Sequence, residues 1–362
     1  MSITAFQSGS ASRGSASFAI DGRPVGGGQP PYLIAEVAQA HDGSLGFAHA
    51  FIDAAAAAGA DAIKFQTHFA DEESTRDEPF RVKFSKQDAT RFDYWKRMEF
   101  TDEQWAGLAD HAREKKLAFI SSAFSARAVE LLERLGMPAW KVASGEVLSP
   151  GFLQRIAATG KPVLLSTGMS PYAEIAKAFD ILAGTGAAVA ILQCTSRYPT
   201  ALQDVGLNVI DELRRRFGCV VGLSDHSGQI YPAMIAMARG ADLIEAHITL
   251  DKRMFGPDVS SSLTVEEFAM LSAMRDSIAV IDSHPVDKDA MAEAMKGMRE
   301  LFQKSVALTR PLPAGTVLTR DMLTTKKPAT GIPAAEIERV VGRRLARDAV
   351  SDRVLNWSDL DE

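Results

Sequence analysis

The sequence predicts an α/β protein: a (β/α)₈ (TIM) barrel followed by a small C-terminal domain. Three observations predict this class. A short apolar run that ends in polar residues recurs eight times between residues 32 and 249. Helix-like segments separate these runs, and glycines often close them. After residue 283 the pattern changes to short strands and turns. Eight strand–helix units over roughly 250 residues match a TIM barrel.

The eight apolar runs are expected to be parallel strands. Nearly continuous runs of Val, Ile, Leu and Ala are typical of strands buried on both faces. A doubly wound open sheet is the alternative. That fold usually carries a Gly-rich loop after its first strand, and EVAQAHDGS has no G-x-G-x-x-G. The expected strands span residues 32–38, 62–68, 118–124, 139–145, 162–168, 189–195, 219–225 and 243–249.

The segments between the runs carry helix signals. Residues 47–59, FAHAFIDAAAAAG, are rich in alanine and end in glycine. Residues 170–184 begin with Ser170 and Pro171, an N-cap followed by a first-turn proline. The insert 69–101 follows the second strand and is rich in charged and aromatic residues. A long loop on the catalytic face of a barrel predicts a lid or a wall of the substrate site.

The chain is expected to have four parts. Residues 1–30 are a tail and leading segment with a Ser/Gly-rich start that predicts disorder. Residues 31–283 form the barrel, and residues 284–302 form a polar linker without a strand signal. Residues 303–362 form the small C-terminal domain. So small a domain has little core of its own, so we expect it to dock on another surface.

Composition excludes several classes of partner. The net charge of −6 argues against nucleic acid, and no apolar run is long enough to span a membrane. The start of the chain lacks the apolar core of a secretory signal. Two cysteines, Cys194 and Cys219, fit a reducing compartment. We therefore expect a cytoplasmic protein.

Polar side chains stand where the expected strands end. In a parallel barrel these ends converge on one face. So much polarity would be costly to bury without partners, so it predicts an active site there. The residues are Glu36, Lys64, Gln66, Ser122, Lys141, Ser144, Glu146, Ser166, Thr167, Ser196, Tyr198, Ser224, Asp225, His226, Glu245 and His247.

Two lysines among these residues predict an anion site. Lys64 and Lys141 lie near several serines, and ammonium and hydroxyl groups together suit a phosphate or a carboxylate. The alternative is that each lysine pairs with a carboxylate such as Glu36 or Glu146.

Two histidines at neighbouring strand ends predict a metal site. His226 and His247 could hold a cation whose remaining positions take water or substrate, which suits a Lewis acid. Manganese, magnesium, cobalt and zinc all fit such ligands. A structural role is the alternative.

His41 and His68 are weaker candidates near the same face. Cys194, on an apolar strand, is expected to be a core residue rather than a nucleophile. The remaining histidines, expected at the surface or in packing, are His49, His111 and His284.

In order along the chain, seven stretches resemble the sialic acid (N-acetylneuraminate) synthase family, which includes legionaminic and pseudaminic acid synthases and spore-coat relatives. Residues 303–362 resemble the SAF (antifreeze-like) domain of that family, through SVALTRPLPAGTVL, KKPATGIP and VVGRRLARDAV. The seven stretches are IAEVAQAHDGSLGFAHAFIDAAAAAGADAIKFQTH, FISSAFS, KVASGE, LLSTGMS, LQCTSRYPT, GLSDHS and EAHITLDKRMFGPD.

The resemblance implies a transferase that condenses phosphoenolpyruvate with an N-acylated mannosamine-type sugar and releases phosphate. It places Glu36, Tyr198 and Asp258 in the catalytic centre, with Gln66, Tyr198 and Asp258 facing the sugar. It implies that His226 and His247 bind a divalent metal, Mn²⁺ first, with Mg²⁺ or Co²⁺ as alternatives. It also implies a homodimer in which the SAF domain covers the partner's active site. The residues implied to hold phosphoenolpyruvate are Lys64, Ser122, Lys141, Ser144, Ser166 and Ser224.

Departures from the family pattern concentrate on the sugar side. Ser196 replaces an asparagine near phosphoenolpyruvate, and Lys327 replaces an arginine that reaches the sugar's N-acyl group. Lysine lacks the planar fork of arginine. The family's N-H-N-G is Ala-His-Asp-Gly here, at residues 40–43. The reaction class is therefore predicted more firmly than the sugar. The alternatives are another barrel aldolase, a 3-deoxy-octulosonate-type synthase, or a sugar-binding or scaffold homologue that has lost catalysis.

Overall fold

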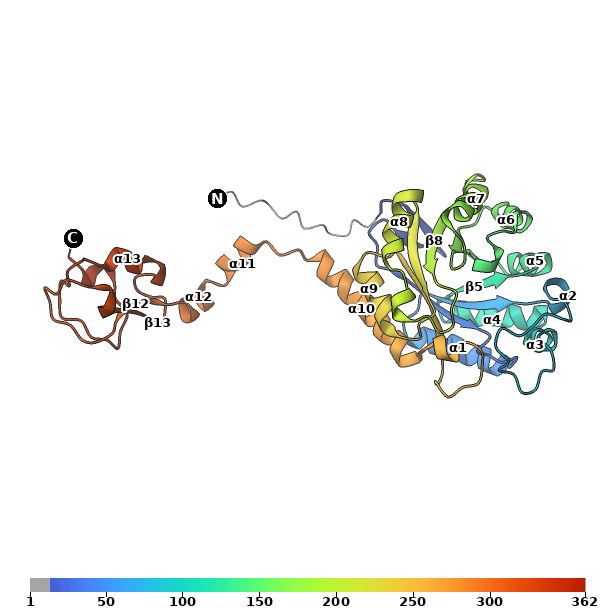
Figure 1. Cartoon of the computed structure of the whole chain (residues 1–362), viewed down its shortest axis with the longest axis horizontal. Coiled ribbons are helices and arrows are strands. Elements are labelled where there is room, and N and C mark those ends of the chain that lie inside the picture. The colour runs from blue at the N-terminus through green and yellow to red at the C-terminus, as the bar shows by residue number, and fades with distance from the viewer. Residues whose placement is uncertain (1–13, 362) are drawn as a thin grey trace. The chain divides into compact units, whose positions relative to one another are not determined.

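The computed structural model describes residues 14–361 (Figure 1). The chain divides between Ser283 and His284 into two compact units. The part of the expected N-terminal tail that falls on residues 1–13 lies outside the described residues.

The first unit is a closed barrel of eight parallel strands. Each strand pairs with its neighbour in sequence, and β10 closes the ring by pairing with both β9 and β3. The predicted barrel is thus confirmed. Its strands are β3 (Tyr32–Ala38), β4 (Ala62–Thr67), β5 (Ala118–Ala123), β6 (Trp140–Val142), β7 (Val163–Ser166), β8 (Val189–Cys194), β9 (Val220–Asp225) and β10 (Leu243–Thr249).

Helices surround the barrel (Figure 1). The main hydrophobic core lies between them and the outward-facing strand residues, such as Leu33, Ile63 and Val221. Gly218 ends one helix in the left-handed conformation that glycine adopts without strain. The helices are α1 (Leu45–Ala57), α4 (Asp102–Glu114), α5 (Ala126–Arg134), α6 (Pro150–Ala157), α7 (Tyr172–Ala183), α8 (Asn208–Phe217), α9 (Ile230–Ala238) and α10 (Val265–Ser283).

The inside of the barrel changes character along its axis. Inward positions near the strand starts are apolar and fully buried, for example Ile34, Ile120 and Leu164. Two residues further along the same strands stand Glu36, Ser122 and Ser166. Because strand side chains alternate with a period of two, one face of each strand supplies first a core residue and then a polar one.

A β-hairpin precedes the barrel, where the sequence predicts only a tail. Strands β1 (Ser17–Ile20) and β2 (Arg23–Gly26) pair antiparallel, and Ile20 and Val25 pack into the apolar interior cluster of the barrel. The tail interpretation is therefore wrong for residues 17–26. The turn is Asp21–Gly22, and both residues have positive φ. Asp-Gly between apolar alternations is a strong hairpin signal, which the Ser/Gly-rich start obscured.

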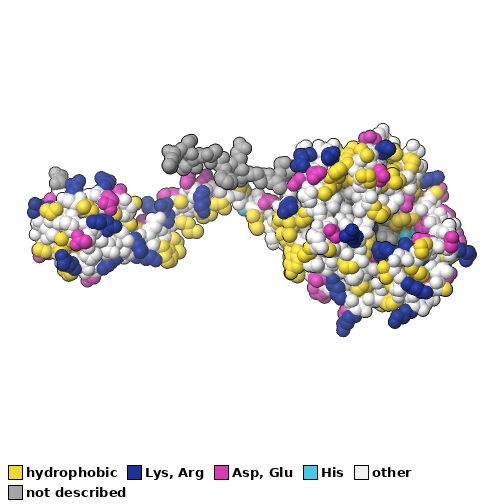
Figure 2. Space-filling model, in the orientation of Figure 1, with side chains coloured by type: hydrophobic (Ala, Val, Ile, Leu, Met, Phe, Trp, Pro, Cys, Tyr) yellow, Lys and Arg dark blue, Asp and Glu magenta, His cyan; other side chains and the backbone are white. Residues whose placement is uncertain are grey.

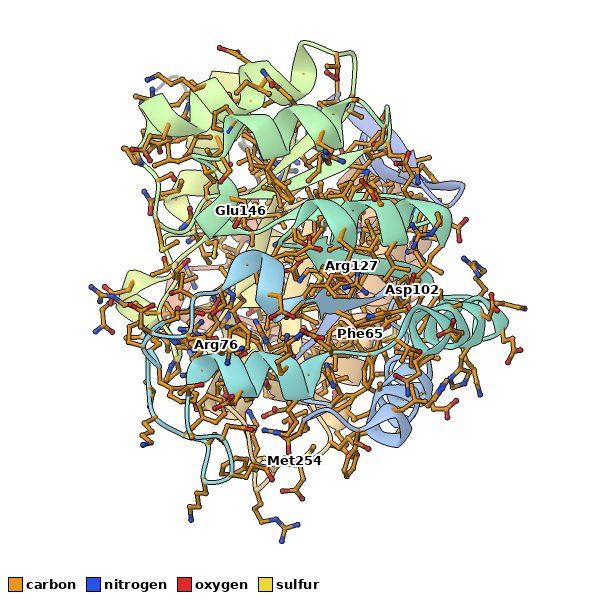
Figure 3. The ribbon with its side chains drawn as sticks, turned by 90° about the vertical axis from the view of Figure 1, so that its right-hand side faces the viewer. Phe65, Arg76, Asp102, Arg127, Glu146 and Met254 are labelled. Atoms are coloured by element: carbon orange, nitrogen blue, oxygen red, sulfur yellow. The ribbon has the colours of Figure 1, made fainter. Side chains whose placement is uncertain are left out.

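The insert after β4 folds over the barrel unit. It contains α2 (Ala70–Glu73) and α3 (Arg91–Met98). The capping box of Thr90 and Asp93 fixes the start of α3. Figure 3 shows the insert, with Arg76 labelled, on the side of the unit that also carries Glu146. A two-residue strand, β11 (Leu263–Thr264), pairs with β10. The 3₁₀ turns of this unit are η1 (Ser144–Glu146), η2 (Leu202–Asp204) and η3 (Val259–Ser261).

The second unit begins with two short helices, in the segment that the sequence predicts to be a polar linker without a strand. A small β-rich domain follows with its own core, which includes Val306, Leu318 and Leu355. Asp359 is buried and accepts from Arg347 Nε at 2.6 Å and from Asn356 N at 2.9 Å. Its elements are α11 (Lys288–Ala294), α12 (Lys296–Phe302), β12 (Ser305–Leu308), η4 (Arg320–Met322), β13 (Leu323–Lys326), η5 (Ala334–Glu336), α13 (Ile337–Val340) and η6 (Trp357–Asp359).

The surface mixes acidic and basic side chains, as Figure 2 shows for one face. Within residues 14–361, no helix combines the length and apolarity needed to cross a bilayer.

A buried ion pair ties the last barrel helix to the strands. Asp61, just before β4, accepts from Leu33 N at 2.8 Å and from Arg275 of α10 at 3.0 Å. Arg275 and Asp61 are both buried. Removing one member of such a pair leaves the other charge buried and uncompensated.

We therefore expect Asp61→Ala to lower the free energy of unfolding of the barrel unit by about 3 kcal/mol. Urea unfolding followed by tryptophan fluorescence measures this change. Asp102→Ala is the matched control, because Asp102 pairs with Arg134 on the exposed surface at 2.9 Å. That change should cost less than about 1 kcal/mol. Equal effects of the two substitutions would contradict the role assigned to Asp61.

Candidate active site

A cavity of about 430 Å³ opens at the carboxyl ends of the barrel strands. Strand register explains why distant residues meet there. Glu36 pairs with Lys64, Ser122 with Lys141, and Ser224 with Glu245, so their side chains stand at nearly the same level around the ring. The cavity brings together most of the predicted strand-end residues, namely Glu36, Lys64, Gln66, Ser122, Lys141, Ser144, Glu146, Ser166, Ser196, Tyr198, Ser224, His226, Glu245 and His247.

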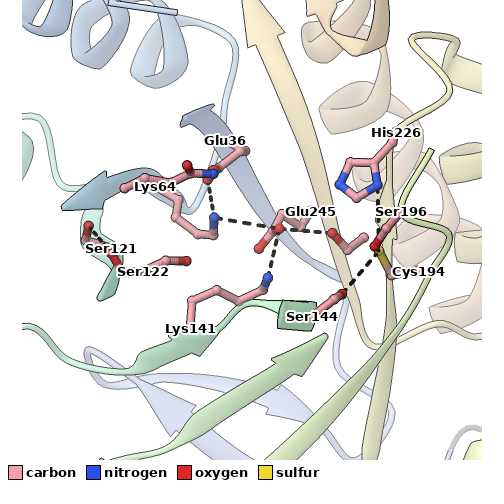
Figure 4. Close-up of polar contacts among 12 residues, drawn as sticks. Glu36, Lys64, Ser121, Ser122, Lys141, Ser144, Cys194, Ser196, His226 and Glu245 are labelled. Atoms are coloured by element: carbon pink, nitrogen blue, oxygen red, sulfur yellow. Dashed lines mark hydrogen bonds and ion pairs between the residues drawn. The ribbon is translucent and has the colours of Figure 1, made fainter. Parts of the chain in front are cut away.

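Two lysines and two glutamates form a buried charge network at the base of the cavity (Figure 4). Lys64 makes an ion pair with Glu36. Glu245 Oε1 lies 3.2 Å from Lys141 Nζ, 3.8 Å from Lys64 Nζ, and accepts from Ser224 Oγ at 3.0 Å. All four charged side chains are nearly inaccessible to solvent. The alternative that the lysines pair with carboxylates is therefore correct, with Glu245 rather than Glu146 as the second partner.

The two glutamates respond differently to the network. Burial raises the pKa of the Glu36 carboxyl to about 7, although Lys64 acts in the opposite direction. Burial also acts to raise the pKa of Glu245, but Lys141 and Lys64 together hold it below its usual range. Glu245 is thus the fixed negative charge, and Glu36 is the group poised to exchange a proton near neutral pH.

Glu36 is further held by the backbone and by Gln66. Gln66 Nε2 donates to Glu36 Oε1 at 3.1 Å. The register of β3 and β4 shifts between Glu36 and Ala38, and Ala38 has φ +48°. A positive φ at a non-glycine residue is strained and persists only when its surroundings enforce it. The bulge therefore re-aims the strand directly after Glu36.

The serines supply hydroxyl groups around the lysines. Ser144 Oγ accepts from Gly168 N at 3.0 Å, which holds the start of the next loop against the site. Among the residues that the structure describes, Ser166 Oγ is buried without a hydrogen-bond partner. A buried hydroxyl without a partner is costly unless a ligand engages it. Ser166 is therefore ready to donate to an anionic oxygen.

His226 and His247 lie side by side in the cavity wall, with ring centroids 5.2 Å apart and ring planes inclined by 59°. His226 Nδ1 lies 3.1 Å from the carbonyl oxygen of Thr195, which requires Nδ1–H and leaves Nε2 as an acceptor 3.1 Å from the Tyr198 hydroxyl. Burial lowers the pKa of His226 to about 4 and that of His247 well below its usual value. Neutral imidazoles oriented in this way are the form that binds metal.

The donor set fits a metal that keeps open positions. Across residues 14–361, no group of three or more His, Cys, Asp and Glu side chains is arranged to hold an ion. Two imidazoles with water or substrate in the other positions remain compatible with a Lewis-acid site. A site closed by protein ligands alone is not formed.

Cys194 lies at the cavity but is not activated. Its Sγ lies 3.6 Å from His226 Nδ1, and the residue is only 5% exposed. Burial raises the pKa of the thiol, so it stays protonated near neutral pH. This environment agrees with the expectation that Cys194 is no nucleophile.

Four predicted residues lie elsewhere. Asp258 lies beside the cavity rather than in it, and Arg81 NH2 donates to it at 3.2 Å. Lys327 belongs to the second unit, where its ammonium lies over the ring of Phe302. Asp225 accepts from Ser227 N at 3.1 Å and stabilises a turn, and Thr167 donates to the carbonyl of Leu192.

The insert contributes residues that line the cavity. The sequence predicted the insert as a lid or a wall of the substrate site but did not identify these residues individually. They are Glu73, Glu78, Arg81, Arg91 and Trp95. Their positions depend on tertiary packing, so no periodic pattern marks them individually.

His68, a weak candidate from the sequence, lines the cavity. Its ring stacks between Trp95 at 4.1 Å and Phe124 at 4.5 Å. Its nitrogens contact Glu73 and, at 3.2 Å, Gln66 Oε1. It therefore connects the insert to Gln66. His41, by contrast, is fully buried against Phe100.

The arrangement can bind a small molecule with several anionic oxygens. Two ammonium groups, the Ser166 hydroxyl and two neutral imidazoles converge in one cavity. Charge developing on an oxygen at this place would be stabilised by groups already in position.

Comparison with known proteins places the chain in a family. N,N'-diacetyllegionaminic acid synthase of Campylobacter jejuni is 32% identical over 89% of this chain and 98% of that protein. Human N-acetylneuraminate-9-phosphate synthase is 34% identical over 90% of this chain and 91% of its own. A crystal structure of N-acetylneuraminic acid synthetase from Leptospira borgpetersenii, in complex with citrate, matches with a TM-score of 0.69 at 28% identity, covering 79% of this chain and 99% of that one.

Family models agree with the division of the chain. The model of the NeuB family matches residues 51–284, and that of the SAF domain matches residues 303–361. The resemblance predicted from the sequence motifs is confirmed, and the chain belongs to the NeuB family, with a SAF domain at its C-terminal end.

Proposed function

We propose that this protein is a nonulosonic acid (sialic acid-like) synthase. It condenses phosphoenolpyruvate with an N-acylated mannosamine-type sugar and releases phosphate by C–O cleavage. The observation that carries the proposal is the joint placement of Lys64, Lys141 and the partnerless Ser166 hydroxyl in one cavity with His226 and His247. The names of the related synthases support it.

The lysine network suits the charge of phosphoenolpyruvate. Glu36 and Glu245 make ion pairs with Lys64 and Lys141. A bound phosphate and carboxylate offer the lysines new oxygen partners, and charge-assisted hydrogen bonds of this kind are strong. Lys141 and Ser166 then stand ready to stabilise the phosphate as negative charge moves onto it.

The bond changes follow from this placement. The methylene carbon of phosphoenolpyruvate forms a bond to the aldehyde carbon of the open-chain sugar. The aldehyde oxygen gains a proton and becomes a hydroxyl group. Water adds to the carbon that bears phosphate, and the tetrahedral product loses phosphate as that C–O bond breaks. Glu36 accepts or returns a proton, as its pKa near 7 allows. A divalent metal held by His226 and His247, Mn²⁺ first with Mg²⁺ or Co²⁺ as alternatives, would polarise the aldehyde oxygen.

The sugar lies, in this proposal, beside Gln66, Tyr198 and Asp258. Ser196 lines the same cavity, and its Oγ lies 4.0 Å from Cys194 Sγ. The family pattern has an asparagine at position 196. Both cysteines are free and buried, which fits a cytoplasmic enzyme.

A homodimer completes the site in this proposal, with the SAF domain of one copy covering the barrel mouth of the other. Lys327 then reaches the partner's sugar. Apolar side chains on the segment between the two domains support an interface, because they are exposed and would gain from burial. They include Ile281, Val286, Met298, Leu301 and Phe302.

The reaction is tested by phosphate release. The full-length protein, phosphoenolpyruvate and Mn²⁺ should release phosphate only when an acylated mannosamine-type sugar is added. A chelator should abolish release, and Mn²⁺ should restore it. Lys141→Met is the negative control. It removes the ammonium group at a similar side-chain volume and should abolish phosphate release. Release with an unacylated aldose phosphate instead would favour a 3-deoxy-octulosonate-type synthase, and no release with any sugar would favour a binding or scaffold protein.

Glu36→Gln should bind phosphoenolpyruvate but form no product. In the natural enzyme, affinity for this anion should fall as pH rises from about 6 to about 8, because ionised Glu36 competes for Lys64 and repels the ligand. The variant should lack that part of the fall. Calorimetry at both pH values measures it, and the ligand's own ionisation affects both proteins equally. Near-normal turnover by the variant would remove Glu36 from the mechanism.

Mixing two inactive variants tests the shared site. A Lys141→Ala chain has a defective barrel, and a Lys327→Ala chain has a defective SAF domain. If the SAF domain acts on the partner, mixed dimers should recover phosphate release, because one of their two sites is intact. Absence of recovery, despite subunit exchange shown by light scattering and mass spectrometry, would contradict the arrangement.

A further inference from the structure

Two histidines that the sequence places at the surface or in packing meet on the outside of the barrel unit. His49 lies on α1 and His111 on α4, and these two helices pack against each other. Their Nδ1 atoms are 2.9 Å apart, and their ring centroids are 5.0 Å apart. Both side chains are partly exposed, so water and dissolved ions reach them. Neither residue lines the cavity, so the pair is separate from the candidate active site.

A carboxylate prepares one of these imidazoles to bind a metal. Asp53 Oδ1 lies 3.3 Å from His111 Nε2 and 2.6 Å from Lys115 Nζ. The hydrogen bond from Lys115 is the main cause that holds the pKa of Asp53 below its usual range, so this carboxylate is ionised. It favours a proton on Nε2 of His111 and leaves the lone pair on Nδ1, the atom that faces His49. Carboxylates support histidine ligands in metal sites in this way.

The second imidazole also has a lone pair to offer. Burial lowers the pKa of His49, and His111 acts in the same direction, so His49 is neutral near pH 7.5. Without a metal, one of the two Nδ1 atoms carries a proton and donates it to the other. A neutral imidazole can carry its proton on Nε2 instead. Both Nδ1 lone pairs are then available to one cation.

The spacing of the pair suits a tetrahedral zinc ion. Two nitrogens that each lie about 2.0–2.1 Å from zinc, at a tetrahedral angle, are about 3.3 Å apart. The two Nδ1 atoms therefore need to separate by only about 0.4 Å from their present 2.9 Å, which small side-chain rotations provide. Imidazole is a ligand that suits zinc, whereas magnesium and calcium take oxygen. Water completes the coordination, because both side chains are partly exposed.

We propose that His49 and His111 form a zinc site on the outside of the barrel unit, separate from the metal site proposed in the cavity. The two Nδ1 atoms and two waters bind Zn²⁺, and Asp53 holds His111 through its Nε2. The ion joins the helix after β3 to the helix after the insert, through residues 62 positions apart in the sequence. Bound zinc stabilises the folded barrel unit, because the unfolded chain does not hold the two imidazoles together.

Zinc binding by the full-length protein tests the proposal. Equilibrium dialysis against zinc chloride at pH 7.5 counts the ions bound per chain. The natural protein should bind one more zinc ion than His49→Gln or His111→Gln, since glutamine is a good helix former but lacks an imidazole. His284→Gln is the matched control, because it removes an exposed histidine from the second unit and should leave the count unchanged. Equal counts for the natural protein and both helix variants would overturn the proposal.

The supporting carboxylate has its own test. Asp53→Asn should weaken zinc binding at this site by about tenfold, because the carboxylate beside a ligand typically contributes that much to metal affinity. Competition with a fluorescent zinc chelator measures the affinity. Asp110→Asn is the matched control, since Asp110 is also an exposed helix residue but pairs with Arg113. An unchanged affinity in Asp53→Asn would overturn the role of Asp53 in the site.

Spectroscopy and stability locate the ion. In protein labelled with ¹⁵N-histidine, zinc should shift the Nδ1 resonances of His49 and His111 together, with the same dependence on zinc concentration. Zinc at about 100 times its Kd should raise the melting temperature of the barrel unit by about 5 °C more in the natural protein than in His111→Gln. Nδ1 resonances that do not respond to zinc would show that the pair is a hydrogen bond only, and would overturn the proposal.

Discussion

The carboxylate of Glu245 is the constraint on which the site depends. It holds the ammonium groups of Lys64 and Lys141 and the hydroxyl of Ser224 around one oxygen, far from solvent. Two buried ammonium groups without it would repel each other. With it, Lys64 and Lys141 are held in position around one carboxylate oxygen. The cost of burying these charges is offset by mutual pairing, so the cavity is ready to receive an anion.

The barrel makes this arrangement possible through its two-residue alternation. Each inward strand face begins in the apolar interior and ends in the polar ring, so a rigid core directly supports the reactive groups. Sites on regular elements are held more precisely than sites on loops. The variable parts, the insert and the loop after β10, surround the ring and shape the space next to it.

Much of the fold and of the cavity lining could be predicted from the sequence. Eight apolar runs and their polar ends predicted the barrel and fourteen of the residues that line its cavity, since parallel strands must present their carboxyl ends together. The partners of the ion pairs could not be predicted. Lys141 pairs with Glu245 rather than Glu146, because the choice depends on how the strands are staggered around the barrel. The hairpin over residues 17–26 was missed, although Asp21-Gly22 marks its turn. The place of His68 and of the insert residues that line the cavity depends on how an irregular insert packs, and such packing leaves no periodic pattern in the sequence.

The hairpin has a consequence for the order in which ligands bind and leave. Ile20 and Val25 pack into the buried apolar layer at the end of the barrel opposite the cavity, so ligands reach the lysines from the cavity side. A small molecule bound deep in the cavity is then covered by a second molecule bound above it. The deeper molecule must therefore bind first and leave last.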